Sequence, residues 1–200
     1  MESRFIADIF VDGANAPMDV KFTKGKDRDY IQVCRADGTM AATTFPKKGM
    51  FPHDAIHLIV ERRLEYNFGF WGRILDGAMP EDISAIAKAG GHASSTRAGK
   101  PAEDIVELLC AERLVECFEA EMWSKHSDNA TLRSVLGAAC SQSKISVPNV
   151  SDEDISSIRG DLKQLLAEWQ SLAIGESLRL CWRQQSLAGR RWRKPEQPRK

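Results

Sequence analysis

The segment from Phe51 to Glu61, with the sequence FPHDAIHLIVE, most constrains what this chain can fold into. Read as a helix, it gathers four ionisable side chains within about 100° of its circumference, because each residue advances by ~100°. Apolar residues fill most of the remaining directions. A helix that is apolar on most sides is buried, so its polar side chains require hydrogen-bond partners, a metal ion or a cleft. These four side chains are His53, Asp54, His57 and Glu61.

The spacing of the two histidines favours a divalent metal site, with zinc or iron as the expected ion. His53 and His57 stand about 6 Å apart along a helix axis, so both imidazoles can reach one ion, as they do in zinc helices of the HExxH type. In such helices the acid after the first histidine is the catalytic base. Here that acid is Asp54, one methylene shorter. We predict both histidines as metal ligands and Asp54 as a catalytic base or an orienting group, in hydrolytic or other Lewis-acid chemistry.

Glu61 is expected to bind the metal or to orient a ligand. It lies roughly 9 Å along the axis from the midpoint of the two histidines, so a metal between His57 and Glu61 would exclude His53 from the ligand set. Either arrangement needs a further ligand from elsewhere in the chain. The possible sources are a row of acids on one face of a later helix and a histidine in a glycine-flanked loop, although a solvated face is the simpler interpretation of the acids. These residues are Glu112, Glu116, Glu119 and His92.

A second interpretation belongs to a different class of function. The chain would be a non-enzymatic structural or protein-interaction domain. The polar stripe of the 53–61 helix would then be a buried hydrogen-bond network that ties this helix to the sheet and to Arg62 and Arg63. Metal analysis with and without His57→Ala distinguishes the two interpretations.

Around this helix the sequence predicts an α+β fold. Alternating apolar residues predict N-terminal strands between about 18 and 45, with Asp37-Gly38 as a hairpin turn, and a period-two run over 176–183 predicts a C-terminal strand beside them. Together they form a small antiparallel sheet packed against a mainly helical middle. The helices are expected over 53–66, 101–123, 129–139 and from Ser151 to about 172.

Composition and charge bound the remaining expectations. A chain of 200 residues suits one domain, which we place at 1–185. Residues 171–200 carry eight basic and two acidic residues, and 186–200 are too polar to pack, so we expect a disordered basic tail capable of weak nucleic-acid contact. The sequence contains no apolar run long enough to predict a membrane helix. Its five cysteines include no CxxC pair, which fits a reducing cytoplasm. Other partners and the oligomeric state are not predicted.

The motifs RADGT (35–39), FPHDAIHLIVE (51–61) and GFWG (69–72) together resemble a family of uncharacterised bacterial proteins. In that family a short N-terminal sheet leads into a helix with the same pattern, His-Asp-x-x-His-x-x-x-Glu. The resemblance covers about the first 80 residues and the C-terminal strand. It implies the same fold outline and draws attention to the same helix, and it implies no reaction. The pattern differs from HExxH peptidases, which have Glu at the position of Asp54 and a third histidine after a glycine turn.

Overall fold

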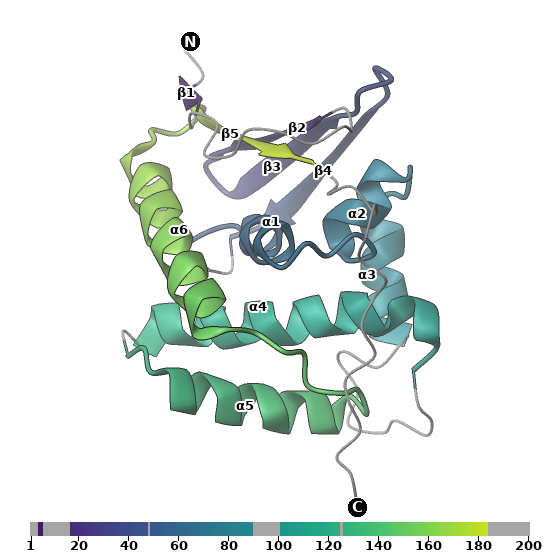
Figure 1. Cartoon of the computed structure of the whole chain (residues 1–200). Helices are drawn as coiled ribbons and strands as arrows, with labels where there is room; N and C mark the ends of the chain where they lie inside the picture. The colour runs from purple at the N-terminus through teal and green to yellow at the C-terminus, as the bar shows by residue number, and fades with distance from the viewer. Residues whose placement is uncertain (1–3, 6–16, 48, 90–100, 125, 184–200) are drawn as a thin grey trace, which may run out of the picture.

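The computed structural model describes residues 4–5, 17–47, 49–89, 101–124 and 126–183. Its sheet has the strand order β1-β5-β2-β3-β4 (Figure 1). The last four of these form the predicted antiparallel sheet, and β1 adds a short parallel edge beside β5 that the sequence pattern did not indicate. The strands are β1 (Arg4–Phe5), β2 (Met18–Thr23), β3 (Arg28–Cys34), β4 (Met40–Pro46) and β5 (Ser177–Trp182).

The hairpin between β3 and β4 forms at the predicted dipeptide. Gly38 has φ +83°, a left-handed conformation that glycine adopts without a steric cost. The Asp37 carboxylate accepts a 2.9 Å hydrogen bond from the amide of Thr39, which closes the turn. Beyond it, Cys34 pairs with Met40 and the strands continue in register to Arg28 and Pro46.

The helices lie below one face of the sheet in successive layers (Figure 1). The helix with the polar arc lies directly beneath the sheet, the long helix α4 crosses below it, and α5 lies below α4. None of the helices in the described part of the chain combines the length and apolar character needed to cross a membrane. The helices are α1 (His53–Arg63), α2 (Phe70–Leu75), α3 (Pro80–Ala89), the short 3-10 helix η1 (Glu103–Ile105), α4 (Val106–Ser124), α5 (Asn129–Gln142) and α6 (Asp152–Ser171).

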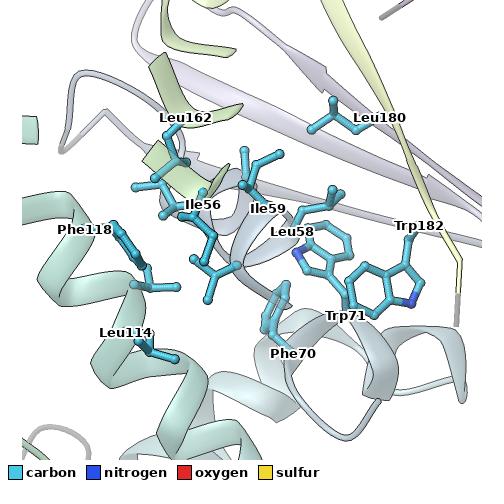
Figure 2. Packing of buried hydrophobic residues seen from close by; sticks show 14 of the residues in the cluster. Ile56, Leu58, Ile59, Phe70, Trp71, Leu114, Phe118, Leu162, Leu180 and Trp182 are labelled. Atoms are coloured by element: carbon cyan, nitrogen blue, oxygen red, sulfur yellow. The ribbon is translucent and has the colours of Figure 1, made fainter. Parts of the chain in front are cut away.

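Helix α1 occupies the centre of the hydrophobic core, as its sequence predicted. Seven consecutive residues, from Ala55 to Glu61, are buried. Figure 2 shows its apolar side chains between Leu180 of the sheet and Phe118 of α4, which lies beside Ile56; all belong to one buried cluster. Because α1 is covered on all sides between Ala55 and Glu61, the two polar side chains of this stretch, His57 and Glu61, need partners inside the protein.

Helix α6 flanks α1 with an apolar stripe. At the predicted start of this helix, Ser151 caps the first turn in a capping box with Asp154. The stripe is buried along the whole helix and comprises Ile155, Ile158, Leu162, Leu165 and Trp169.

The sheet and the helices together confirm the predicted α+β architecture. The tail predicted at 186–200 lies outside the described residues.

Candidate functional site

Helices α1 and α4 bring histidine and glutamate side chains together inside the core. His57 of α1 is 1% exposed, and its two ring nitrogens contact different carboxylates. Nδ1 lies 2.9 Å from Oε1 of Glu61, one turn further along the same helix, and Nε2 lies 3.5 Å from Oε2 of Glu112 on α4. His57 therefore lies between two carboxylates, one from each helix.

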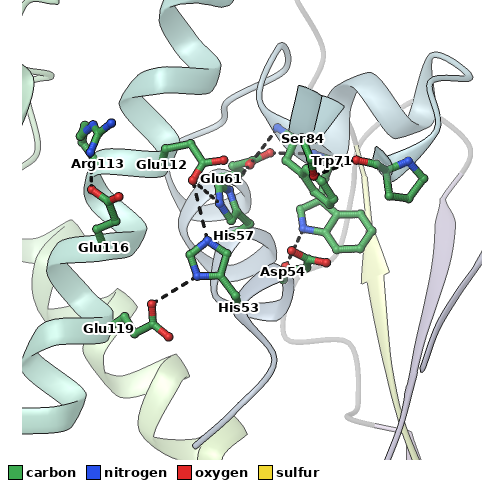
Figure 3. A network of polar contacts seen from close by, with 12 residues as sticks. His53, Asp54, His57, Glu61, Trp71, Ser84, Glu112, Arg113, Glu116 and Glu119 are labelled. Atoms are coloured by element: carbon green, nitrogen blue, oxygen red, sulfur yellow. Dashed lines mark hydrogen bonds and ion pairs between the residues drawn. The ribbon is translucent and has the colours of Figure 1, made fainter. Parts of the chain in front are cut away.

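His53 repeats this arrangement one turn earlier on α1. Its Nε2 lies 3.7 Å from the same Oε2 of Glu112, and its Nδ1 lies 3.3 Å from Oε2 of Glu119. The His53 side chain is 39% exposed, in contrast to His57. The cluster consequently reaches solvent at the start of α1 and is closed at the His57 end. Figure 3 shows the two histidines of α1 beside Glu112 and Glu119 of α4.

The two histidines converge on one carboxylate oxygen. One ligand atom each from His53, His57 and Glu112 lie within 4.8 Å of one another, a spacing that can hold a metal ion. The sequence predicted both histidines as ligands, and the structure brings them together. The third side chain of this group is Glu112, one of the acids named as a possible source of a further ligand.

Glu61 lies on the opposite side of His57 from Glu112 and outside this group of three. Its Oε1 accepts hydrogen bonds from His57 and from the amide of Phe70, and its Oε2 accepts one from the amide of Trp71. Of the two roles expected for Glu61, these contacts match the orienting one.

Asp54 also lies outside the group of three. Its side chain is half-buried, next to His53 in sequence and facing the side of α1 where α2 packs (Figure 3). Burial raises the pKa of the Asp54 carboxyl, and the nearby charges of His57 and His53 act in the opposite direction. The catalytic role predicted for Asp54 stays a prediction.

In the metal-free protein the carboxylates hold protons on both imidazoles. Burial alone would lower the pKa of His57, but the charge of Glu112 and hydrogen bonds with Glu112 and Glu61 outweigh burial and raise that pKa to about 10. At His53 burial again acts downward, and hydrogen bonds with Glu112 and Glu119 raise the pKa to about 9. Because metal ligation needs neutral imidazole, binding of a cation would displace these protons.

The burial of the Glu112 side chain was not predicted from the sequence. A solvated face was the simpler interpretation of the acidic row on α4, yet Glu112 is 9% exposed. Glu116 fits that interpretation better, because it is partly exposed and forms a 2.6 Å ion pair with Arg113. The pattern that could have indicated its burial is the one used for α1: the acid stands on a helix that is apolar in most directions.

Two other expectations concern residues outside the group of three. The contacts of the cluster include residues of α4 and the start of α2. The alternative hydrogen-bond network, which ties α1 to the sheet and to Arg62 and Arg63, stays a prediction. His92, a possible ligand, lies outside the described residues.

Comparison of the chain with known protein families, with curated proteins and with solved structures found no match. The resemblance of residues 35–72 to uncharacterised bacterial proteins therefore stays a prediction.

Proposed function

We propose that the protein binds one divalent metal ion, with zinc preferred, through Nε2 of His53, Nε2 of His57 and Oε2 of Glu112. The observation that carries this proposal is the shared orientation of the two histidines. Each directs Nε2 at the same carboxylate oxygen and places Nδ1 against a different carboxylate. Carboxylate contacts at the second nitrogen are the usual partners of metal-binding histidines, because they fix the tautomer and the ring orientation.

The ligand types favour zinc. Two imidazoles favour zinc or iron over magnesium or calcium, and a site of nitrogen and oxygen ligands generally binds zinc more tightly than iron(II). The Glu112 oxygen lies 3.5 Å and 3.7 Å from the two nitrogens, so one ion can reach all three ligand atoms after a small adjustment of the side chains.

Three protein ligands leave one position of a tetrahedral ion open to water, which is the arrangement of catalytic rather than structural zinc sites. A zinc-bound water loses a proton near neutral pH and becomes a nucleophile for hydrolysis. We propose Asp54, beside the first histidine, as the acid–base group of such a reaction. Its role differs from that of a ligand, so Asp54→Asn is expected to keep stoichiometric zinc.

Metal analysis of the purified protein tests the proposal. After chelator treatment and reloading with zinc, iron(II) or magnesium, we expect about one zinc per chain, less iron and no magnesium by elemental analysis. His57→Ala and Glu112→Gln are expected to lose zinc. Glu116→Gln, the same substitution one turn further along α4 at a residue paired with Arg113, is the matched control and is expected to keep it.

Two results would overturn the proposal. Wild-type protein that takes up no zinc would leave the cluster as a buried hydrogen-bond network in a structural or interaction domain. Equal zinc content in wild type, His57→Ala and Glu112→Gln would move any metal to another part of the chain.

A further inference from the structure

The Glu61 carboxylate is fully buried and is held by three donors. Besides Nδ1 of His57 at 2.9 Å, the amide of Phe70 lies 2.9 Å from Oε1 and the amide of Trp71 lies 3.0 Å from Oε2. A carboxylate oxygen can only accept, so all three contacts fix the carboxylate in one orientation. In a neutral His57 the proton then sits on Nδ1, which leaves the lone pair of Nε2 facing Glu112.

Gly69 supplies the space for this carboxylate. A Cβ atom at position 69 would lie 2.6 Å from the carboxyl carbon and from Oε2 of Glu61, well inside van der Waals contact. The backbone at Gly69 has φ −73°, which any residue can adopt, so the need for glycine here is one of space alone. The turn between α1 and α2 therefore lies so close to Glu61 that it leaves no room for a side chain at position 69.

The same turn is fixed to α4, the helix that carries the Glu112 ligand. Oε1 of Glu107, which precedes Glu112 by little more than one helical turn, accepts a hydrogen bond from the amide of Phe68. The turn is also packed against itself, because a Cβ at Gly72 would lie 1.8 Å from the carbonyl oxygen of Asn67. The donors that hold Glu61 are thus fixed relative to both metal-binding helices.

We infer that Glu61 is the positioning residue of the metal site, and that the 67–72 turn holds it in place through the amides of Phe70 and Trp71 in a space that only glycine at position 69 leaves open. This inference rests on the proposed metal site. His53 provides an internal comparison, because its orienting partner Glu119 is 30% exposed and lies at the longer distance of 3.3 Å. The two carboxylates should therefore contribute unequally to metal binding.

Zinc affinity, measured by competition with a chromophoric chelator, tests the inference in four variants. Glu61→Gln places an amide NH₂ against an N–H donor, and Gly69→Ala displaces the carboxylate. Both are expected to weaken zinc binding ~10–100-fold without removing a ligand. Glu119→Gln, the same substitution at the other histidine, is expected to cost several-fold less. Gly160→Ala, at a helical glycine with open space around it, should leave affinity unchanged.

Two spectroscopic measurements distinguish positioning from a general loss of stability. Cobalt(II) in place of zinc reports ligand geometry, and its visible bands should shift in Glu61→Gln and match wild type in Gly160→Ala. Long-range ¹H–¹⁵N spectra of the zinc-loaded wild type need no variant, and they should show His57 bound through Nε2 with a proton on Nδ1.

The outcomes separate this inference from the proposed function. If the wild type binds no zinc, the proposed function fails and this inference fails with it. If the wild type binds zinc but His57 ligates it through Nδ1, or Glu61→Gln binds as tightly as wild type with unchanged cobalt bands, only the positioning role is overturned. Should Glu61→Gln and Gly69→Ala both fail to fold, the His57 spectrum of the wild type decides.

Discussion

The indole Nε1 of Trp71 donates a 2.9 Å hydrogen bond to the backbone carbonyl oxygen of Asp54 and joins α2 to the first turn of α1. Trp71 is fully buried, with its ring edge-to-face against Phe22 of the sheet and Phe70 of its own helix. The first turn of α1 carries His53, so one tryptophan connects the sheet, α2 and the solvent-facing end of the cluster.

Replacing this tryptophan should destabilise the protein through two effects. Trp71→Phe removes the hydrogen bond to Asp54 and leaves unfilled space in the core, which together are expected to lower the free energy of unfolding by about 1–3 kcal/mol. Urea unfolding followed by circular dichroism measures the change. Trp123→Phe is the matched control, because Trp123 is 57% exposed and its replacement should stay within about 0.5 kcal/mol of wild type. Equal effects in the two variants would contradict the role given to Trp71.

The stability of the metal-free protein should fall as the pH rises from neutral to alkaline. The pKa of His57 is about 10 in the folded protein against 6.5 for an ordinary histidine. The folded state therefore binds the proton more tightly, so its stabilising effect is complete below about pH 6.5 and is lost as the pH rises through 10. Urea unfolding in the presence of chelator, repeated between pH 6 and 10, should show this decline, and His57→Gln should show a shallower one.

Buried thiols provide the correction for this experiment. Burial raises the pKa of Cys110 and of Cys117 from 9.0 to about 12, so both also lose stabilisation at alkaline pH, but only above about pH 9. Their contribution is common to wild type and His57→Gln and cancels in the comparison. Parallel pH profiles for the two proteins between pH 6.5 and 9 would refute the elevated histidine pKa.

Replacing each of two helical glycines by alanine should change the stability of the protein in opposite directions. Gly160 lies in the middle of α6 on its exposed face, and an added Cβ would meet no other atom. Gly160→Ala is therefore expected to raise the free energy of unfolding by about 0.5–1 kcal/mol, because alanine loses less conformational entropy than glycine when the helix forms. A Cβ at Gly72 would collide with the backbone carbonyl of Asn67, and this carbonyl can move away only if the whole 67–72 turn shifts. Gly72→Ala should therefore lower stability by more than about 2 kcal/mol in the same urea titration.

Truncation from the C-terminus should separate the sheet from the basic tail. A chain ending at residue 175 loses β5, which pairs with both β1 and β2, and is expected to lose its cooperative thermal transition. A chain ending at residue 185 keeps β5 and removes only the polar segment, so its Tm should equal that of the full chain. A cooperative melt in the shorter chain would show that the sheet closes without β5.

Sequence patterns predicted the parts of this fold that depend on local periodicity. The alternation Leu178, Leu180, Trp182 placed β5 correctly, and the apolar directions around His57 predicted a buried helix with satisfied polar groups. Strand β1 was missed because two residues carry no period that a pattern could reveal.

The candidate site was only half predictable for a related physical reason. The i, i+4 spacing of His53 and His57 is a property of one helix and can be read from the sequence. Glu112 joins them through the packing angle and register of α4 against α1, and no spacing within either helix contains that information. The contact of Gly69 with Glu61 likewise depends on how closely a turn approaches a helix.

The place of β5 in the sheet has a consequence for the order in which the protein folds. Residues near both ends of the chain form adjacent strands, since Met18 pairs with Trp182 and Thr23 with Ser177. Contacts so distant in sequence form late, because a long loop must close before they contribute. During synthesis the edge of β2 that pairs with β5 stays unpaired with it until residues 177–182 have been made. The apolar face above α1 is therefore completed only after helices α1 to α6 have been synthesised.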